Sequence, residues 1–223
     1  MHPYLKGIQE IFSQHANVEK AIGAKAYMLH QFEFFGIVTA TRRKLSKDYM
    51  KSNTLNSLTE LDNIVQECFE LPQREYQYFA VELISFHKKI WQPSVIKTIE
   101  YCLVNKSWWD TVDHVASECL TDYFKLYPNK INSITNRWNQ SENIWLQRSS
   151  IMFQKAFKAN TNTELLSKYI LNCASSKEFF VQKAIGWALR EYSKTNGAWV
   201  KQFVATHQLA PLSKREALKR MAD

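Results

Sequence analysis

The chain has 223 residues, 45% of them hydrophobic, and its 29 Lys and Arg outnumber 21 Asp and Glu, for a formal net charge of +8. A chain of this length can bury the core of one domain or one repeat array. The excess of positive charge favours a polyanionic partner over a cationic or uncharged one. An apolar run of about 18 residues, as a membrane span needs, is missing from the sequence, and so is a signal-peptide pattern after the first Met. The sequence therefore predicts a soluble cytoplasmic protein.

The predicted elements are helical from one end to the other. Apolar residues recur three and four positions apart, beginning with Ile8, Ile11 and Phe12, and only 5 Gly and 5 Pro interrupt the pattern. This spacing is typical of amphipathic helices. Prolines stand between the apolar runs, where they begin or end helices, at Pro72, Pro93, Pro128 and Pro211. The sequence predicts an all-α protein of about a dozen helices.

Two serine-to-glutamate spacings predict how particular helices begin. Ser57 precedes Glu60 by three residues, and Ser213 precedes Glu216 by the same interval. In a capping box the serine hydroxyl and the glutamate carboxylate each accept a hydrogen bond from the backbone at the other end of the first turn. We expect both segments to begin helices in this way.

A weak internal repeat runs through the chain. Four similar segments align on a polar residue at intervals of about 35 residues, a period typical of helix-pair repeats. The aligned residues are Gln77, Thr111, Gln147 and Gln182. The tetratricopeptide consensus is absent, so the pattern predicts an α-solenoid of about six HEAT-like helix-pair repeats, forming a single domain over residues 1–223.

Positive charge recurs in the equivalent segment of successive repeats. Because equivalent positions line one surface of a solenoid, these charges predict a basic concave groove that tracks a DNA duplex. An ordinary solvated polar face would also account for them. The residues are Arg42, Arg43, Lys44, Lys47, Arg148, Lys155, Lys158, Lys183, Arg190, Lys194, Lys214, Arg215, Lys219 and Arg220.

Aromatic rings that lie beside charged residues distinguish a DNA-binding groove from a solvated polar face. Trp109 and Asp113 are four residues apart, so they share one face of a helix, where a ring and a carboxylate could hold a flat cation. Trp187 lies between Lys183 and Arg190 at helical spacing, on a cationic stripe. These pairings favour a functional site.

The neighbours of these two tryptophans point to packing roles. Trp108 cannot face the same way as the adjacent Trp109, and we expect it in the core. Gly186 beside Trp187 leaves space for a close approach of backbone or ligand.

Cysteine and histidine spacing gives no metal motif. The four cysteines form no Cys-x-x-Cys pair, and we expect reduced, buried thiols at Cys68, Cys102, Cys119 and Cys173. The six histidines form no cluster at the spacing of metal ligands. The sequence predicts no metal site.

Several blocks together resemble the AlkD family of alkylpurine DNA glycosylases, which are bacterial proteins of HEAT-like repeats. The similarity covers nearly the whole chain. The blocks are Met1-His2-Pro3, Lys106-Ser107-Trp108-Trp109-Asp110-x-Val112-Asp113, Asn143-Ile144-Trp145-Leu146-Gln147-Arg148, Ser175-Ser176-Lys177-Glu178-Phe179-Phe180, Gln182-Lys183-Ala184-Ile185-Gly186-Trp187-x-Leu189-Arg190-Glu191-Tyr192 and Leu209-Ala210-Pro211-Leu212-Ser213-Lys214-Arg215-Glu216-Ala217.

The resemblance implies a reaction and a set of site residues. A monofunctional enzyme of base excision repair would remove 3-methyladenine and 7-methylguanine from double-stranded DNA without a metal or cofactor and without flipping the base, and would leave an abasic site. A monomer is the default for a groove that wraps DNA. The implied catalytic residues are Trp109, Asp113 and Trp187, with Arg148 holding the phosphate beside the lesion. Together with the charge pattern, the resemblance predicts DNA contacts at Arg148, Tyr27, Arg43, Lys106, Lys183, Arg190, Lys194 and Lys214.

Some positions depart from the family pattern. Ala40 replaces the family's proline, and Val38 stands where a relative has a polar residue near the lesion. A helix over 17–34, which in the family approaches the minor groove, is expected at full length. Two other classes stay open: a DNA-binding paralogue without catalysis would lose Asp113, and a protein-interaction scaffold would have an apolar groove.

Overall fold

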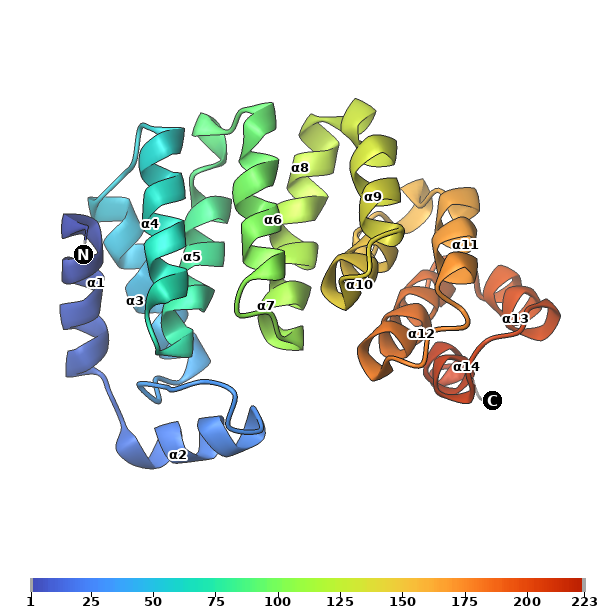
Figure 1. Ribbon diagram of the computed structural model, residues 1–223, viewed down its shortest axis with the longest axis horizontal. Coiled ribbons are helices and arrows are strands. Elements are labelled where there is room, and N and C mark those ends of the chain that lie inside the picture. The colour runs from blue at the N-terminus through green and yellow to red at the C-terminus, as the bar shows by residue number, and fades with distance from the viewer. Residues whose placement is uncertain (1, 222–223) are drawn as a thin grey trace. The chain divides into compact units, whose positions relative to one another are not determined.

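The computed structural model describes residues 2–221, and their regular secondary structure is helical (Figure 1). Within this range, strand-type pairing is limited to one isolated bridge between Glu33 and Gln73. The predicted all-α class is confirmed. No helix in the described part of the chain has both the length and the apolar character that a membrane crossing requires.

The helices group into two compact units that divide between Lys106 and Ser107. Both lie inside the single domain that the sequence predicts over 1–223. The helices of the first unit are α1 (Pro3–Gln14), α2 (Val18–Tyr27), α3 (Thr39–Ser52), α4 (Leu58–Glu70), α5 (Arg74–Phe86) and α6 (Ile96–Val104), with 3₁₀ turns at Lys88–Ile90 and Pro93–Val95.

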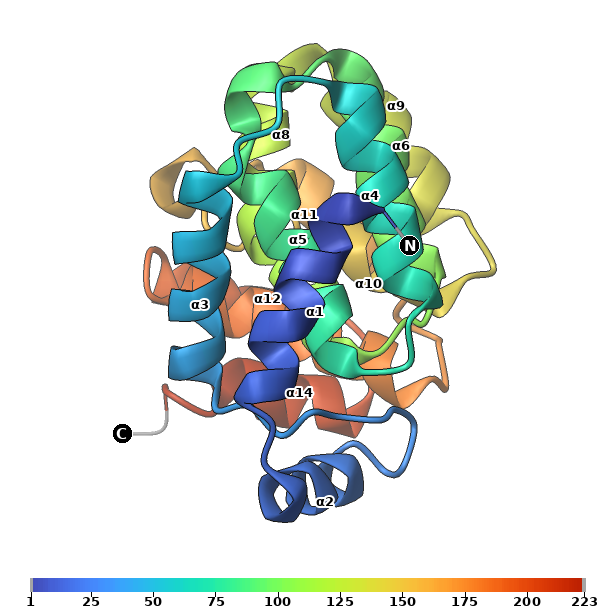
Figure 2. The same ribbon diagram turned by 90° about the vertical axis from the view of Figure 1, so that its left-hand side faces the viewer.

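The first unit is a two-layered stack of helix pairs. Helices α4 and α6 pack in one layer, α3 and α5 pack in the other, and α1 contacts both α3 and α4 (Figure 2). An aromatic core fills the space between the layers, where the ring of Phe12 lies 6.0 Å from that of Tyr76 and 6.2 Å from that of Phe79. The apolar stripes of amphipathic helices drive this burial.

Helix α2 is the exception, because it has no buried residues. The predicted helix over 17–34 is wrong in length: it ends at Tyr27, since the backbone turns left-handed at Leu29 and His30, with φ of 52° and 58°. Non-glycine residues rarely adopt this conformation, and it cannot continue a right-handed helix.

The loop that returns from α2 is anchored to α5 by a buried carboxylate. Glu75 accepts hydrogen bonds from the backbone N–H groups of Phe35, Gly36 and Ile37, at 3.0, 2.9 and 3.3 Å. Gly36 has a φ of 82°, and a Cβ there would lie 2.1 Å from the carbonyl oxygen of Asn17. Glycine is therefore required for this loop to pass so close to the start of α2.

The second unit is also built of packed helix pairs. Helices α10, α12 and α14 contact one another in chain order, α7 packs on α10, and α9 packs on α11. Its helices are α7 (Trp109–His114), α8 (Thr121–Leu126), α9 (Ile131–Asn139), α10 (Ile144–Met152), α11 (Thr163–Asn172), α12 (Phe179–Ser193), α13 (Gly197–Thr206) and α14 (Pro211–Leu218). A π-helical segment, Val115–Leu120, joins α7 to α8, and 3₁₀ turns occur at Pro128–Lys130 and Lys158–Asn160.

The repeated glutamines have one structural role in both units. The side-chain amides of Gln77, Gln147 and Gln182 each donate to the carbonyl oxygen six residues earlier, at 3.1, 2.7 and 2.9 Å. Each bond ties the second helix of a pair to the loop before it. Thr111 departs from the pattern, because its shorter side chain donates to the carbonyl of Trp108, three residues earlier, at 3.4 Å.

The two predicted capping boxes have different outcomes. Ser57 caps α4 by accepting a hydrogen bond from the backbone N–H of Glu60 at 3.3 Å, as expected for the serine. The prediction for Ser213 is wrong, because Ala210 is the capping residue and Pro211 is the first residue of α14. Ser213 therefore lies inside the helix, and Glu216 is left for another role.

Candidate active site

Trp109 and Asp113 lie on α7, a helix of 6 residues that starts directly after Trp108 in an extended conformation. Trp109 is half-buried in its first turn. The helix passes into the π-helical segment just beyond Asp113, and the hydroxyl of Ser117 donates to the Asp113 carbonyl at 2.7 Å. A π-helical turn of this kind is frequent beside functional residues.

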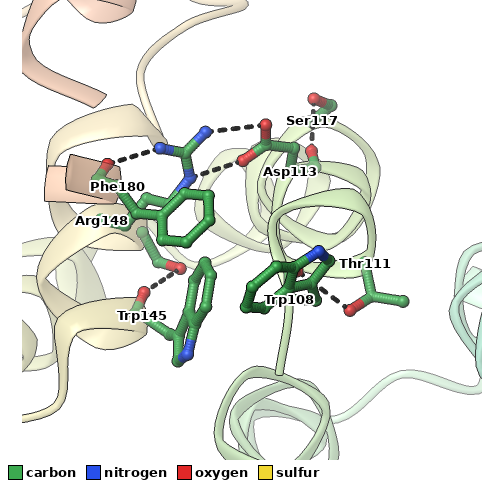
Figure 3. Close-up of polar contacts among 8 residues, drawn as sticks. Trp108, Thr111, Asp113, Ser117, Trp145, Arg148 and Phe180 are labelled. Atoms are coloured by element: carbon green, nitrogen blue, oxygen red, sulfur yellow. Dashed lines mark hydrogen bonds and ion pairs between the residues drawn. The ribbon is translucent and has the colours of Figure 1, made fainter. Parts of the chain in front are cut away.

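A two-point ion pair joins Asp113 to Arg148 of α10 (Figure 3). The Nε and Nη2 groups of Arg148 donate to Oδ1 and Oδ2 of Asp113, both at 2.8 Å. The planar guanidinium matches the carboxylate edge, so the pair fixes the orientation of Asp113. The Asp113 side chain is still 16% exposed, and each oxygen keeps a second lone pair for another donor.

Arg148, the predicted phosphate contact, is buried and has three hydrogen-bond partner atoms. Its side chain is 1% exposed, and its third donor group, Nη1, donates to the carbonyl of Phe180 at 2.6 Å. These bonds use three of the five N–H groups of the guanidinium, and the predicted phosphate contact stays a prediction. The role of Arg148 here is to hold the carboxylate.

The rings of Trp108, Trp145 and Phe180 cluster beside this ion pair (Figure 3). The Phe180 ring lies 5.1 Å from that of Trp108 and 4.9 Å from that of Trp145. Trp108 is half-buried in this cluster rather than fully in the core. The prediction of a core position is therefore wrong, although the ring packs in a cluster that holds the start of α12 against α7 and α10.

Trp187 of α12 is surrounded by positive charge. The guanidinium carbons of Arg148 and Arg190 lie 5.3 and 5.7 Å from its ring centroid, and the ammonium nitrogens of Lys183 and Lys155 lie at 5.4 and 6.0 Å. The cationic stripe predicted for Trp187 is confirmed. Through Arg148, the ring is also joined to the carboxylate of Asp113.

Glu216 of α14 completes this cluster, although its position in the sequence predicted only a capping role. Its carboxylate accepts hydrogen bonds from Lys183 at 2.9 Å, from the indole Nε1 of Trp187 at 3.1 Å and from Arg190 at 2.9 Å. The hydrogen bond from Lys183 is the largest cause of a lowered pKa for this carboxyl group, with further contributions from Trp187 and Arg190. One feature of the sequence could have indicated this role, because Glu216 is a single acidic residue in a basic helix.

The close approach of α14 to α12 depends on Gly186. A Cβ at this position would lie 2.5 Å from the Cβ of Glu216 and 2.9 Å from the carbonyl oxygen of Ser213. The close approach expected at Gly186 is therefore to the backbone of another helix. The hydroxyl of Ser213 adds a bond of 2.8 Å to the carbonyl of Gln182.

The other side chains of the second unit that are predicted to contact DNA differ in their solvent exposure. Lys183 and Arg190 are 22% and 23% exposed and both bind Glu216. Lys194 is 47% exposed and pairs with Glu191 at 2.6 Å. Lys214 is half-exposed on α14. Lys194 and Lys214 are thus the more accessible members of this group.

In the first unit, Tyr27 is 70% exposed on α2. Arg43 is 54% exposed and lies 3.5 Å from a carboxylate oxygen of Glu82. The ammonium of Lys106 donates to the carbonyl of Leu71 at 2.7 Å, and burial together with the neighbouring Arg74 lowers the pKa of Lys106. Tyr27 and Arg43 therefore remain accessible to a ligand, whereas the Lys106 ammonium already has a partner.

Metal-ligating side chains do not gather in the described range: within residues 2–221, no three His, Cys, Asp or Glu side chains form a group that could hold a metal ion. All four cysteines are buried free thiols, as the spacing predicted.

Comparison with known proteins supplies a family. The family model of the DNA alkylation repair enzyme matches residues 8–221. A solved structure described as a predicted DNA alkylation repair enzyme from Enterococcus faecalis is 34% identical, with 94% of this chain and 98% of that chain covered and a TM-score of 0.87. The structure of smu.31 from Streptococcus mutans UA159 is 16% identical over 80% of this chain and 96% of that chain, with a TM-score of 0.61, and shares the fold. No curated protein matches the sequence.

Proposed function

Because the chain belongs to the DNA alkylation repair enzyme family, we propose that it is a monofunctional DNA glycosylase for alkylated purines. It would hydrolyse the N-glycosidic bond of 3-methyladenine and 7-methylguanine in duplex DNA and leave an abasic site. The observation that carries the proposal is a partly exposed carboxylate, Asp113, held by two hydrogen bonds to the buried Arg148.

The substrate itself supplies much of the driving force. Alkylation at N3 or N7 gives the purine a positive charge, so the bond between C1′ and N9 breaks with its electron pair moving to the base. The base leaves neutral, and no general acid has to protonate it. The protein's task is to stabilise the cationic sugar and to position a water molecule.

Asp113 is suited to both parts of this task. The Arg148 pair uses one lone pair on each of its oxygens, and the other lone pairs can accept a hydrogen bond from water or face the positive C1′. Attack by the water oxygen on C1′ forms the new bond, and its proton passes to the carboxylate or to solvent. Removing a preorganised charge of this kind typically slows an enzyme by about a hundredfold to a thousandfold.

The two tryptophans are proposed to contact the nucleotide from either side of Asp113. The four cations around Trp187 already occupy the region that would attract a substrate cation. We therefore assign Trp187 to packing against the deoxyribose. Lys155, Lys194 and Lys214 are proposed to neutralise the flanking phosphates. Trp109 is assigned to the cationic nucleotide, where a ring contributes about 0.5–2 kcal/mol.

Tyr27 and Arg43 of the first unit are the accessible candidates for further DNA contact. In this proposal the damaged base stays stacked in the duplex, because the contacts are made to sugar and phosphate. The catalytic mechanism uses no metal and no cofactor, the DNA is bound by a monomer, and the reaction takes place in the cytoplasm, where the nucleoid lies.

The test is release of 7-methylguanine from methylated duplex DNA by the wild type, by Asp113→Asn and by the control Asp110→Asn. Asp110 is a second carboxylate on the same helix. We expect wild-type release, a loss of at least about a hundredfold in Asp113→Asn, and a rate near wild type in Asp110→Asn.

Each of these measurements has a result that would contradict part of the proposal. A folded wild type that binds DNA and releases no base would reject the glycosylase in favour of a DNA-binding paralogue. Normal release by a folded Asp113→Asn variant would leave the enzyme in place and remove Asp113 from its chemistry. Thermal melting of each variant separates loss of activity from loss of fold.

A further inference from the structure

Glu216 is a buried carboxylate to which the reaction, as proposed above, gives no role. It is 6% exposed, and it lies on α14, where the sequence pattern predicted a capping box. Burying a carboxylate has a high desolvation cost, and such a group adds little stability beyond what an apolar side chain of the same size would give. A residue of this kind calls for a role other than packing.

Contacts other than those of the Glu216 carboxylate also hold α14 against α12. Gly186 removes the Cβ that would clash with α14, and Ser213 donates to the carbonyl of Gln182 at 2.8 Å. Neither contact involves the carboxylate of Glu216. Among the described residues, the hydrogen-bond donors to this carboxylate gather around one ring, since Lys183 and Arg190, its two cationic partners, lie within 6 Å of the centroid of Trp187.

The hydrogen bond from Trp187 fixes the indole itself. An indole has one polar group, the Nε1–H, which only donates, so its partner determines the rotation of the ring about the side-chain torsions. Here that partner is Oε2 of Glu216 at 3.1 Å, and the same oxygen also accepts from Arg190 at 2.9 Å. The carboxylate therefore links the ring's orientation to the positions of two cations.

We infer that Glu216 is a positioning residue, which orients the Trp187 indole and holds Lys183 and Arg190 beside it. The expected effect of Glu216 on the reaction rate rests on the proposed function, whereas its effect on the orientation of Trp187 does not. Trp187 touches the sugar in that proposal, and a displacement of about 1 Å in a positioning group can reduce a rate by about a hundredfold. Glu216 acts on the reaction only through Trp187.

The experiment compares Glu216→Gln with Ser213→Ala, which removes a different bond between the same two helices. The first readout is the ¹⁵N–¹H resonance of the Trp187 indole, identified by its absence in Trp187→Phe, together with its hydrogen-exchange rate. We expect Glu216→Gln to shift this resonance and to speed its exchange by at least about tenfold, because glutamine has one acceptor oxygen for three donors. Ser213→Ala should leave the resonance in place.

The second readout is single-turnover release of 7-methylguanine at saturating enzyme. We expect Glu216→Gln to lose about tenfold to a hundredfold in rate while Ser213→Ala stays near wild type. Trp187→Phe keeps a ring but has no Nε1–H, so it should lose a similar factor. The double variant of Trp187→Phe and Glu216→Gln should be no slower than the slower single variant, because Glu216 acts on the reaction only through the Trp187 indole.

The outcomes separate the two proposals. An unchanged Trp187 resonance in Glu216→Gln, or an equal change in Ser213→Ala, would overturn the positioning role. So would multiplicative rate losses in the double variant. If the wild type releases no 7-methylguanine, the glycosylase proposal fails, while the indole resonance still decides whether Glu216 orients Trp187. If Glu216→Gln does not fold, a wild-type rate in Trp187→Phe would overturn the role.

Discussion

Arg148 and Asp113 form a two-point ion pair between residues 35 positions apart, with both bonds at 2.8 Å. One partner is 1% exposed and the other 16%. Since the guanidinium is buried, removing the carboxylate leaves a charge without compensation in a region of low dielectric constant. The carboxylate assigned to the chemistry is thus also part of what holds α7 to α10.

We expect Arg148→Met to lower the free energy of unfolding by about 3–5 kcal/mol, because it breaks a buried pair and removes the donor to the Phe180 carbonyl. Asp113→Asn should also destabilise the protein. The double variant should lose less free energy of unfolding than the sum of the two single losses, with a coupling of about 0.5–3 kcal/mol. Urea unfolding followed by circular dichroism measures all four proteins of the cycle.

The exposed pair between Lys194 and Glu191, whose side chains are 47% and 32% exposed, is the control. Glu191→Gln should cost less than about 1 kcal/mol. Equal losses at the exposed and the buried pair would contradict the importance that we attach to burial.

Gly186→Ala tests the approach of α14 to α12. Its Cβ would lie 2.5 Å from the Cβ of Glu216, so α14 must move, and we expect a loss of about 1–3 kcal/mol. Gly23→Ala is the matched control in α2, since a Cβ there meets nothing within 4 Å. The control should gain up to about 1 kcal/mol from helix propensity. Thermal melting distinguishes them, and a neutral Gly186→Ala would mean that the two helices are not held this closely.

Glu216 should also make stability depend on pH. Its lowered pKa means that the folded state favours the ionised form, so its contribution is complete above the ordinary value of 4.5 and is lost as the pH falls through the lower folded value. The stability difference between the wild type and Glu216→Gln should therefore be constant from pH 7 down to about 5.5 and shrink below about 4.5. Denaturant unfolding across this range provides the measurement. A difference that grows on acidification would contradict the sign.

The repeated glutamine bond can be tested in one repeat. Gln147→Leu removes the bond to the Ser141 carbonyl, and we expect a loss of about 0.5–1.5 kcal/mol. Gln202→Leu makes the same change at an exposed position of α13 and should stay within about 0.5 kcal/mol of wild type. If the two substitutions cost the same, the glutamine register is not a stabilising feature of the repeat.

Local patterns in the sequence predicted the helices and the repeat well. The three-and-four spacing of apolar residues places the helical faces, and the aligned glutamines turn out to make the same bond to the same relative carbonyl. Both depend on residues close together along the chain. Predictions made from two residues alone were less secure: Ser213 and Glu216 have the spacing of a capping box, but the helix already begins at Pro211.

The composition, helical periodicity and family resemblance of this sequence were enough to determine its class, its repeat and the identity of Asp113, Arg148 and Trp187 as residues of interest. Only the tertiary structure decided what each of them touches. Arg148, which is predicted to contact phosphate, is buried and supports Asp113, and Glu216 changed from a cap to the partner of Trp187. The reason is physical: a charged side chain pairs with the group that shares its desolvated environment, and that environment is built by helices distant in sequence.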